Sequence, residues 1–193
     1  MAISRERAWD LLKRYNSEPM HLSHALAVEA CMKFFAQQAG EDPQFWGTVG
    51  LLHDLDWEMT QSDPARHTSE SDRILEAEGV DEATRHAIRS HGWGICSATE
   101  PTSPMEWTLY TIDELTGLVI ATALVRPSRS LDDLTAKSVK KKWKDKAFAA
   151  GVNRDVIASG AERMGKPVDE LMTSVIEALR PVQSQLGLTP LAN

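Results

Sequence analysis

The chain has few cysteines and no long uninterrupted apolar run. Its 193 residues include only Cys31 and Cys96, which are too few for a disulfide framework and match no zinc spacing. We expect both to be reduced and structural. No stretch reaches the roughly 18 uncharged apolar residues of a membrane span, and the first residues, MAISRERAWD, lack a signal-peptide core. These absences predict a soluble, cytoplasmic protein with no membrane association.

Cationic charge is also scarce. The sequence has 21 Lys and Arg residues against 28 Asp and Glu residues, and its net charge is −7. Because binding to duplex nucleic acid is dominated by cationic contacts to phosphate, we expect no general nucleic-acid binding. Small molecules are the expected partners. We find no internal repeat, no low-complexity segment and no feature that indicates an oligomeric state.

Apolar residues recur at helical spacing along most of the chain, and the apolar content of 42% is enough for the core of one domain of this length. Gly47 and Gly50 would allow a neighbouring helix to approach closely. We therefore predict a single-domain all-α bundle. Helices are expected over residues 4–15, 21–38, 43–55, 67–79, 81–92, 104–125 and 167–185.

Two ionisable residues, His53 and Asp54, stand side by side in the apolar run of residues 51–55. Burial of these two side chains without a partner would cost roughly several kcal/mol of folding free energy. A divalent transition metal would be a suitable partner, because imidazole nitrogen and carboxylate oxygen are ligands of this class of ion. Further candidate ligands lie on both sides of the doublet: His24, His67, His91 and Asp113.

The order of these residues and their local sequences resemble the HD-domain metal-dependent phosphohydrolases. The chain is most similar to the small stand-alone branch known as predicted HD-superfamily hydrolases, from its first helix almost to its end. The matching stretches are HALAVEA, GLLHDLDWE, RHTSESDRIL, AIRSHGWG and YTIDELTGLVIATALVRP. The resemblance implies one HD-type domain over residues 1–193, with a metal-site core at about 21–126 and a C-terminal helical extension at about 127–193.

The resemblance also implies a set of metal ligands. It favours His24 over His21 and His91 over His86, so that His21 and His86 are expected to lie outside the site. One ion would use His24, His53, Asp54 and Asp113; His67 and His91 would allow a second ion, with Asp54 as the bridge. The expected cofactor is one or two divalent ions of manganese, iron, cobalt, nickel or zinc.

The implied activity is hydrolysis of a phosphomonoester or phosphodiester in a nucleotide or other small phosphorylated metabolite. A metal ion can bring the pKa of bound water to about 7, and Asp54, the candidate catalytic residue, would hold or help to deprotonate that water. Two alternatives remain open. The same six ligands in relatives can hold a mixed-valence di-iron centre, which would make the protein an oxygenase, or the domain could be a non-catalytic nucleotide-binding module.

The chain departs from the family pattern just after the doublet. Related enzymes often carry Lys or Glu three residues after the aspartate, where this chain has Trp57. No general acid can therefore be transferred by resemblance. Asp56 and Glu58 are candidates by proximity only, and we expect both to be solvated carboxylates in a polar loop.

Lysines form a basic cluster in this acidic protein: Lys137, Lys140, Lys141, Lys142, Lys144 and Lys146. For any one of them, a solvated helix face is the simpler interpretation. The stretch KSVKKKWKDKAFAAGVNR nevertheless resembles this branch of the family. It favours a substrate-binding role for Lys137, Lys146 or Arg154, in which the cationic group would attract a phosphate.

Overall fold

The computed structural model describes residues 3–191, and its regular structure is helical throughout that range. The predicted all-α class is confirmed. The only strand-like feature of the described residues is an isolated β-bridge between Trp93 and Ser97. Within the same range, no helix combines the length and the apolar character that crossing a bilayer requires.

The chain forms two compact units, and the division falls inside a long helix, between Tyr110 and Thr111. We had placed the change from core to extension near residue 126, at the end of that helix. Unit 1 ends earlier along the helix. The predicted boundary and the single-domain organisation both stay predictions.

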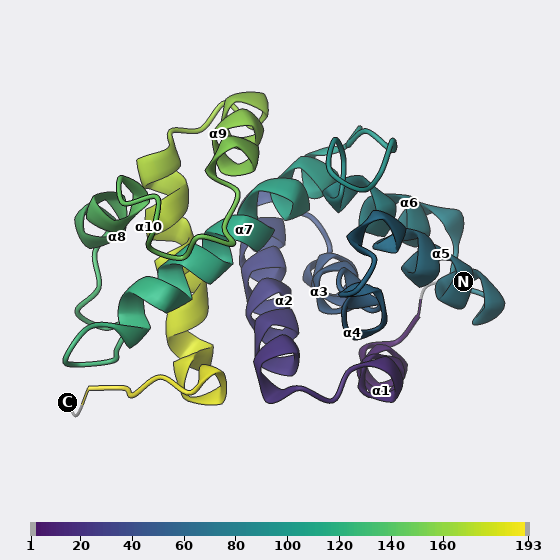
Figure 1. Ribbon diagram of the computed structural model, residues 1–193, viewed down its shortest axis with the longest axis horizontal. Helices are drawn as coiled ribbons and strands as arrows, with labels where there is room; N and C mark the ends of the chain where they lie inside the picture. The colour runs from purple at the N-terminus through teal and green to yellow at the C-terminus, as the bar shows by residue number, and fades with distance from the viewer. Residues whose placement is uncertain (1–2, 192–193) are drawn as a thin grey trace. The chain divides into compact units, whose positions relative to one another are not determined.

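Unit 1 contains the helices from the N-terminus to the first part of the long helix (Figure 1). In chain order they are α1 (Arg5–Tyr15), α2 (Pro19–Ala39), α3 (Pro43–Leu52), α4 (Trp57–Thr60), the 3₁₀ helix η1 (Pro64–Arg66), α5 (Ser69–Ala77), α6 (Glu82–His91) and the start of α7 (Pro104–Leu124). Side-chain oxygens at the N-caps accept hydrogen bonds from first-turn amides, as serine and aspartate caps do. The capping residues are Ser4 for α1, Asp42 for α3 and Asp81 for α6.

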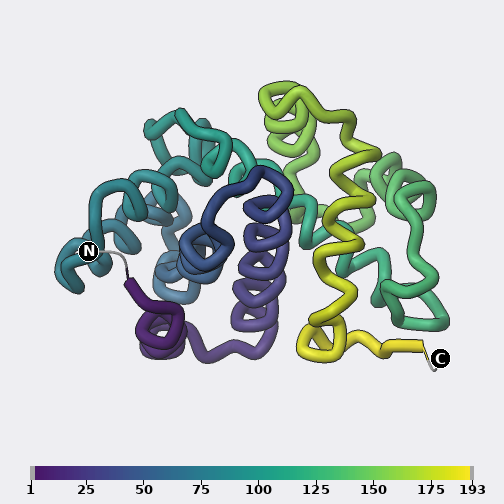
Figure 2. Tube along the Cα trace, turned by 180° about the vertical axis from the view of Figure 1, so that it is seen from behind, coloured from purple at the N-terminus to yellow at the C-terminus, as the bar shows by residue number. Residues whose placement is uncertain are grey.

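Helix α3 packs closely against α2, and Figure 2 shows α3 nearly end-on next to the upright α2. A Cβ atom added at Gly50 would lie 2.8 Å from Met32 Cγ and 3.1 Å from Val28 O, which confirms that glycine is needed for this approach. Leu51, Leu52 and Leu55 are fully buried. The His53–Asp54 doublet is therefore held by a tightly packed segment.

Helix α3 ends at Leu52, so our predicted helix, which extended to residue 55, is too long. The amide of Leu55 bonds to the carbonyl of Leu52, and the amide of Trp57 bonds to that of Asp54. These bonds span three residues rather than four, and they turn the chain directly into α4. His53 and Asp54 thus lie in a tight turn rather than in the last helical turn.

Unit 2 contains the rest of α7, followed by α8 (Ala136–Trp143), α9 (Arg154–Arg163), α10 (Val168–Leu179) and the 3₁₀ helix η2 (Arg180–Leu186). Helix α10 packs against α8, α9 and η2. The helix predicted over 167–185 is divided in two, because Pro181 cannot donate the amide hydrogen bond that would continue α10.

Candidate metal centre

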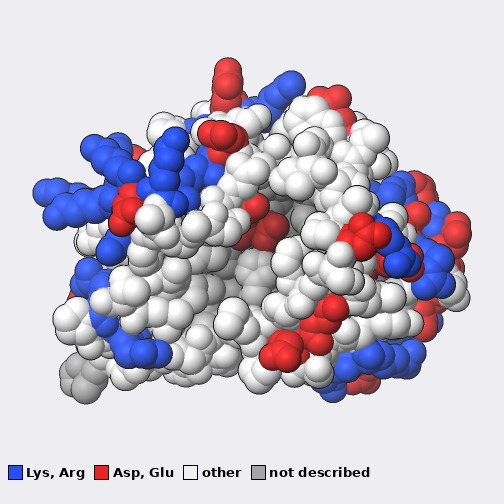
Figure 3. Space-filling view, viewed as in Figure 1, with Lys and Arg blue, Asp and Glu red and all other residues white. Residues whose placement is uncertain are grey.

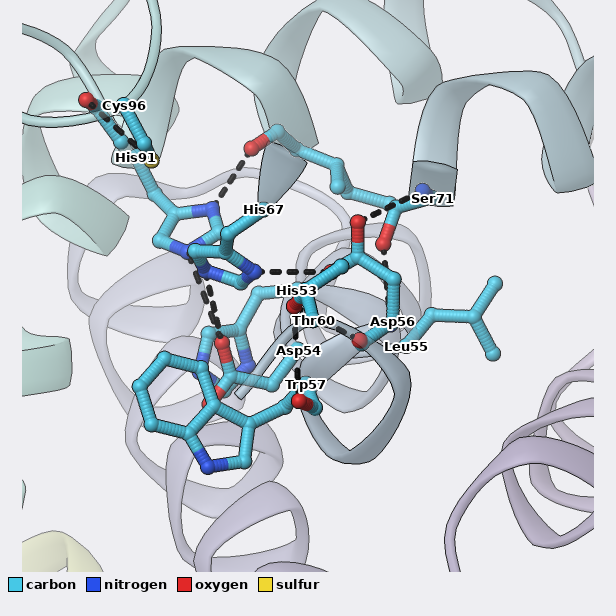
Figure 4. Close-up of polar contacts among 12 residues, drawn as sticks. His53, Asp54, Leu55, Asp56, Trp57, Thr60, His67, Ser71, His91 and Cys96 are labelled. Atoms are coloured by element: carbon cyan, nitrogen blue, oxygen red, sulfur yellow. Dashed lines mark hydrogen bonds and ion pairs between the residues drawn. The ribbon is translucent and has the colours of Figure 1, made fainter. Parts of the chain in front are cut away.

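Asp54 lies at the centre of a group of histidines in unit 1 (Figure 4). Its Oδ1 atom is 3.3 Å from His67 Nε2 and 3.6 Å from His91 Nε2. Its Oδ2 atom is 3.4 Å from His53 Nε2 and 3.8 Å from His24 Nε2. The five predicted ligands that belong to unit 1 are therefore brought together.

These five side chains come from separate elements. His24 lies on α2, His53 and Asp54 on the turn after α3, His67 just before α5, and His91 at the last position of α6. We expected His67 to begin its helix, but α5 begins at Ser69. The position of His91 at the end of its helix is confirmed.

Three of the imidazole rings are oriented by hydrogen bonds at Nδ1. His53 Nδ1 lies 2.7 Å from Gly50 O, and His91 Nδ1 lies 2.6 Å from Ile88 O. His67 Nδ1 lies 2.7 Å from the Asp56 carboxylate. Because these oxygens are acceptors, Nδ1 carries the proton and Nε2 keeps its lone pair in the neutral ring. Metal-binding histidines are commonly held in this way.

The spacing of the ligand atoms suits a metal ion. Asp54, His67 and His91 offer ligand atoms that all lie within 4.8 Å of one another, and the two Nε2 atoms of His67 and His91 are 3.1 Å apart. Atoms that are each about 2.1 Å from one ion lie about 3.0 to 3.4 Å apart at octahedral or tetrahedral angles. Two lone pairs directed at each other would repel, so either a proton on one ring or a metal ion must lie between these two nitrogens. This donor set could therefore hold a metal ion.

The ionisation of the cluster follows from its composition. Burial by itself would raise the pKa of Asp54, but His53, His67 and His91 outweigh burial and hold this pKa well below its usual range. Burial would lower the pKa of His67, but Asp54 and Asp56 raise it to about 9. Since a protonated imidazole has no free lone pair, a metal ion that binds His67 must displace a proton.

Asp56 corrects one of our expectations, because its side chain is fully buried rather than solvated. One carboxylate oxygen accepts from His67 Nδ1, and the other accepts from the Ser71 amide at 2.8 Å. Burial acts to raise the pKa of Asp56, but the bonds to His67 and Ser71 lower it overall. Asp56 thus fixes the orientation of a candidate ligand. The signal was present in the sequence, since Asp56 stands between Leu55 and Trp57 in the apolar setting that drew attention to the doublet.

Glu58 is the second correction, because it is bonded within the protein rather than solvated. Its Oε1 atom accepts from the amides of Ser17 and Glu18, at 2.9 and 2.7 Å, and lies 3.1 Å from His21 Nδ1. Glu58 therefore ties α4 to the start of α2. This arrangement also gives His21 a partner other than Asp54.

Trp57 and His86 complete the surroundings. The half-buried Trp57 ring stands edge-on to His67, with ring centroids 5.2 Å apart. The Nδ1 atom of His86 lies 2.7 Å from Glu106. Each of the two histidines predicted to lie outside the cluster thus bonds to a carboxylate other than Asp54.

The remaining predicted residues belong to unit 2. Asp113 is half-buried on α7, and its role as a ligand stays a prediction. Lys137 and Lys146 are exposed, and Figure 3 shows Lys and Arg side chains gathered over the part of the surface that α8 forms. Their contact with substrate also stays a prediction.

Arg154 requires a correction. Its guanidinium donates to backbone carbonyls at the end of α8 and in the segment that connects α8 and α9, which leaves no N–H group for a substrate phosphate. The accepting carbonyls are those of Trp143, Asp145, Phe148, Ala149 and Val152. Arg154 therefore holds this connection together.

Comparison with known proteins finds no family model that matches the chain, and no curated protein matches it. The likeness to HD-domain enzymes rests on the motif residues themselves. The site is accordingly defined by its geometry, as a cluster of histidine and aspartate side chains that could bind a metal.

Proposed function

We propose that the protein is a metal-dependent phosphohydrolase that acts on a nucleotide or another small phosphorylated metabolite. The observation that carries this proposal is the convergence of histidine Nε2 atoms on one carboxylate, Asp54, with their Nδ1 atoms held by other groups. The order and context of the motif residues support the hydrolase family as the source of this arrangement.

Asp54 would be the bridging ligand. One of its oxygens faces His67 and His91, and the other faces His24 and His53. A single carboxylate can therefore contact both pairs of histidines while it stays deprotonated. Asp113 is the sequence-predicted ligand that would complete the set on the side of His24 and His53.

A bound divalent ion of the manganese-to-zinc series supplies Lewis-acid stabilisation of phosphate oxygens and activates water as a nucleophile. The residues of the chain would orient the reactants. Asp54 would position the attacking water, and Asp56 would keep His67 in the required tautomer. Glu58 is engaged with the start of α2, so we do not assign it as the general acid.

Trp57 supports a nucleotide as substrate. Its half-buried indole lies next to His67, where a base could stack on the ring. Stacking of a base on an aromatic side chain contributes about 1 to 3 kcal/mol in nucleic-acid complexes. Replacement of Trp57 by alanine should therefore raise KM for nucleotides more than KM for sugar phosphates. An equal rise for both classes would argue against stacking.

The proposal is tested by elemental analysis of protein purified without chelators or an affinity metal, paired with phosphate release from nucleotides and sugar phosphates. We expect one or two equivalents of a transition metal and hydrolysis of at least one substrate class. His53→Ala and Asp54→Ala should lose both properties, whereas the matched variants His21→Ala and His86→Ala should keep both.

Other outcomes would overturn the proposal in distinct ways. Protein that neither contains metal nor takes it up on titration would remove the metal centre altogether. Bound iron with oxygen consumption and no phosphate release would identify an oxygenase instead. Tight nucleotide binding without turnover, in metal-loaded protein, would identify a binding module.

A further inference from the structure

A cavity of about 560 Å³ lies in unit 1, lined by residues other than the metal-centre histidines. It is formed where α3 and α7 begin and along the first half of α6 (Figure 1). Small-molecule sites in proteins commonly enclose about 300 to 1,000 Å³. The cavity is thus large enough for a small organic ligand.

Part of the cavity wall is aromatic and apolar. Trp46 and Met105 are buried residues that line it, and the half-buried Phe45 adds a second aromatic ring. Aromatic side chains bury large areas and also attract cations through the negative face of the ring. This wall would therefore accept an aromatic group and tolerate a positive charge next to it.

The helix starts at the cavity are poorly suited to an anion, although helix N-termini often bind anions. The carboxylate of Asp42 already accepts from the amides at the start of α3. Glu106 likewise accepts from the Thr102 and Ser103 amides at the start of α7. An anion would therefore compete with carboxylates that already occupy these donors.

Charged residues that line the cavity are acidic: Glu41, Asp42, Glu82 and Glu106. Glu82 is paired with Arg85 and Arg89, and Glu106 is bonded to His86. Glu41 and Asp42 are exposed, and neither forms an ion pair within the described part of the chain. These two carboxylates would attract a cation to the mouth of the cavity.

His86 supplies a hydrogen-bonding group in the cavity wall. Its Nδ1 atom lies 2.7 Å from the Glu106 carboxylate, and a carboxylate accepts rather than donates. Nδ1 therefore carries a proton, and in the neutral ring Nε2 is an acceptor. A ligand that donates an N–H bond would complement it.

From this combination of an aromatic wall, exposed carboxylates without an ion-pair partner and a histidine acceptor, we propose that the cavity binds a small aromatic molecule that carries a protonated amine. The site shares no residue with the Asp54 cluster. Binding is therefore independent of metal, and it can succeed or fail separately from the proposed hydrolase activity.

The first test uses three matched probes: 2-phenylethylamine, its uncharged analogue 2-phenylethanol and the anion phenylacetate. Binding is followed by the NMR signal of the Trp46 indole N–H, which is assigned with Trp46→Phe. We expect the amine to bind about three- to tenfold more tightly than the alcohol, since one or two exposed charge pairs contribute modestly. Phenylacetate should bind most weakly. The same order is expected in Asp54→Ala protein with chelator present.

A charge-removing variant locates the site. Glu41→Gln combined with Asp42→Asn removes both carboxylates that lack an ion-pair partner, and asparagine keeps the helix cap. Amine affinity should fall to about that of the alcohol. The control removes two exposed carboxylates from α9 in unit 2, Asp155→Asn with Glu162→Gln, and should leave affinity unchanged.

A cavity-filling variant provides an independent check. Ala83 is an exposed helical residue that lines the cavity, so Ala83→Trp should block all three probes without removing a core contact. The proposal is overturned if phenylacetate binds as well as the amine, if no probe shifts the Trp46 signal at millimolar concentration, or if binding survives both variants in folded protein.

Discussion

Histidine meets carboxylate in two contrasting regions of unit 1. At the Asp54 cluster, histidine Nε2 atoms share one carboxylate, and two of those atoms lie 3.1 Å from each other. At the His86–Glu106 pair, one carboxylate oxygen bonds to one imidazole, and the other accepts from the Thr102 and Ser103 amides. The pair completes its own hydrogen bonding. In the cluster, by contrast, several Nε2 atoms face one carboxylate, and bound protons or a metal ion must supply the positive charge between them.

The difference teaches that burial and proximity do not by themselves distinguish a metal centre from a structural ion pair. Glu106 is as deeply buried as the cluster histidines His67 and His91, yet every bond it makes has a donor and an acceptor. Arg and Glu side chains over α5 and α6 also lie close together (Figure 3), and they balance in the same way. The two regions are distinguished by whether each hydrogen-bond acceptor of the group has a donor within the protein.

The largest effect is expected from Asp54→Ala. This change removes the carboxylate that the histidines share, so metal content should fall to background. The activity, measured as kcat/KM for phosphate release, should fall by more than about 100-fold, the upper range for loss of a residue that only supports a ligand. His86→Ala is the matched control and should retain metal. If both variants are folded by circular dichroism and lose metal equally, the two regions do not differ in metal binding and the prediction is wrong.

A smaller effect is expected from Asp56→Asn. The asparagine side chain has one oxygen, so it cannot accept from both His67 Nδ1 and the Ser71 N–H as Asp56 does. The substitution also removes the negative charge next to His67. Metal affinity should fall about 10- to 100-fold, as for other residues that hold a metal-binding histidine. Titration with a competing metal chelator measures this change.

Glu58→Gln serves as the control for Asp56→Asn, because it alters a neighbouring carboxylate that bonds to α2 rather than to a cluster histidine. Its metal affinity should match that of the unmodified protein. Unchanged metal affinity in Asp56→Asn would show that His67 is oriented by its packing alone.

At the His86–Glu106 pair, we expect a substitution to change the stability of the protein and to leave metal binding unchanged. Ser103 and Glu106 form a reciprocal capping box at the start of α7. Glu106→Gln should lower the free energy of unfolding by about 1 kcal/mol, a typical value for a helix cap, while metal content stays constant. Urea denaturation measures the first quantity and elemental analysis the second. Loss of metal in this variant would link two regions that we treat as independent.

The smallest effect is the pH dependence of the stability difference between the unmodified protein and Glu106→Gln. Burial acts to raise the pKa of Glu106, but bonds from Thr102, His86 and Ser103 lower it overall from its ordinary value of 4.5. Because the pKa is lower in the folded state, the carboxylate contributes stability that is present above pH 4.5 and is lost as pH falls through the folded-state pKa.

The stability difference between the unmodified protein and Glu106→Gln should therefore shrink as the pH is lowered below 4.5. Urea denaturation at a series of pH values, with chelator present so that metal release does not contribute, gives the comparison. A difference that grew toward low pH would mean that the protonated carboxyl, rather than the carboxylate, forms the cap.

Much of the helical framework was predictable, because caps and apolar periodicity are local properties. The helices expected from residues 4, 43 and 81 begin at Arg5, Pro43 and Glu82. Helix ends were less accurate, as at Leu52, where a turn held by three-residue hydrogen bonds replaces the last predicted turn. Such turns depend on packing rather than on the composition of the segment.

The order of histidine and aspartate along the chain was enough to nominate the ligands, since residue type decides which atoms can bind a metal. Only the tertiary structure decided that His24, His53, His67 and His91 meet at Asp54. It also decided that Asp56 is buried against His67 and that Arg154 is used by the backbone. The physical reason is that donor type is a property of one residue, whereas burial, ring orientation and proton sharing arise from contacts between segments far apart in the sequence.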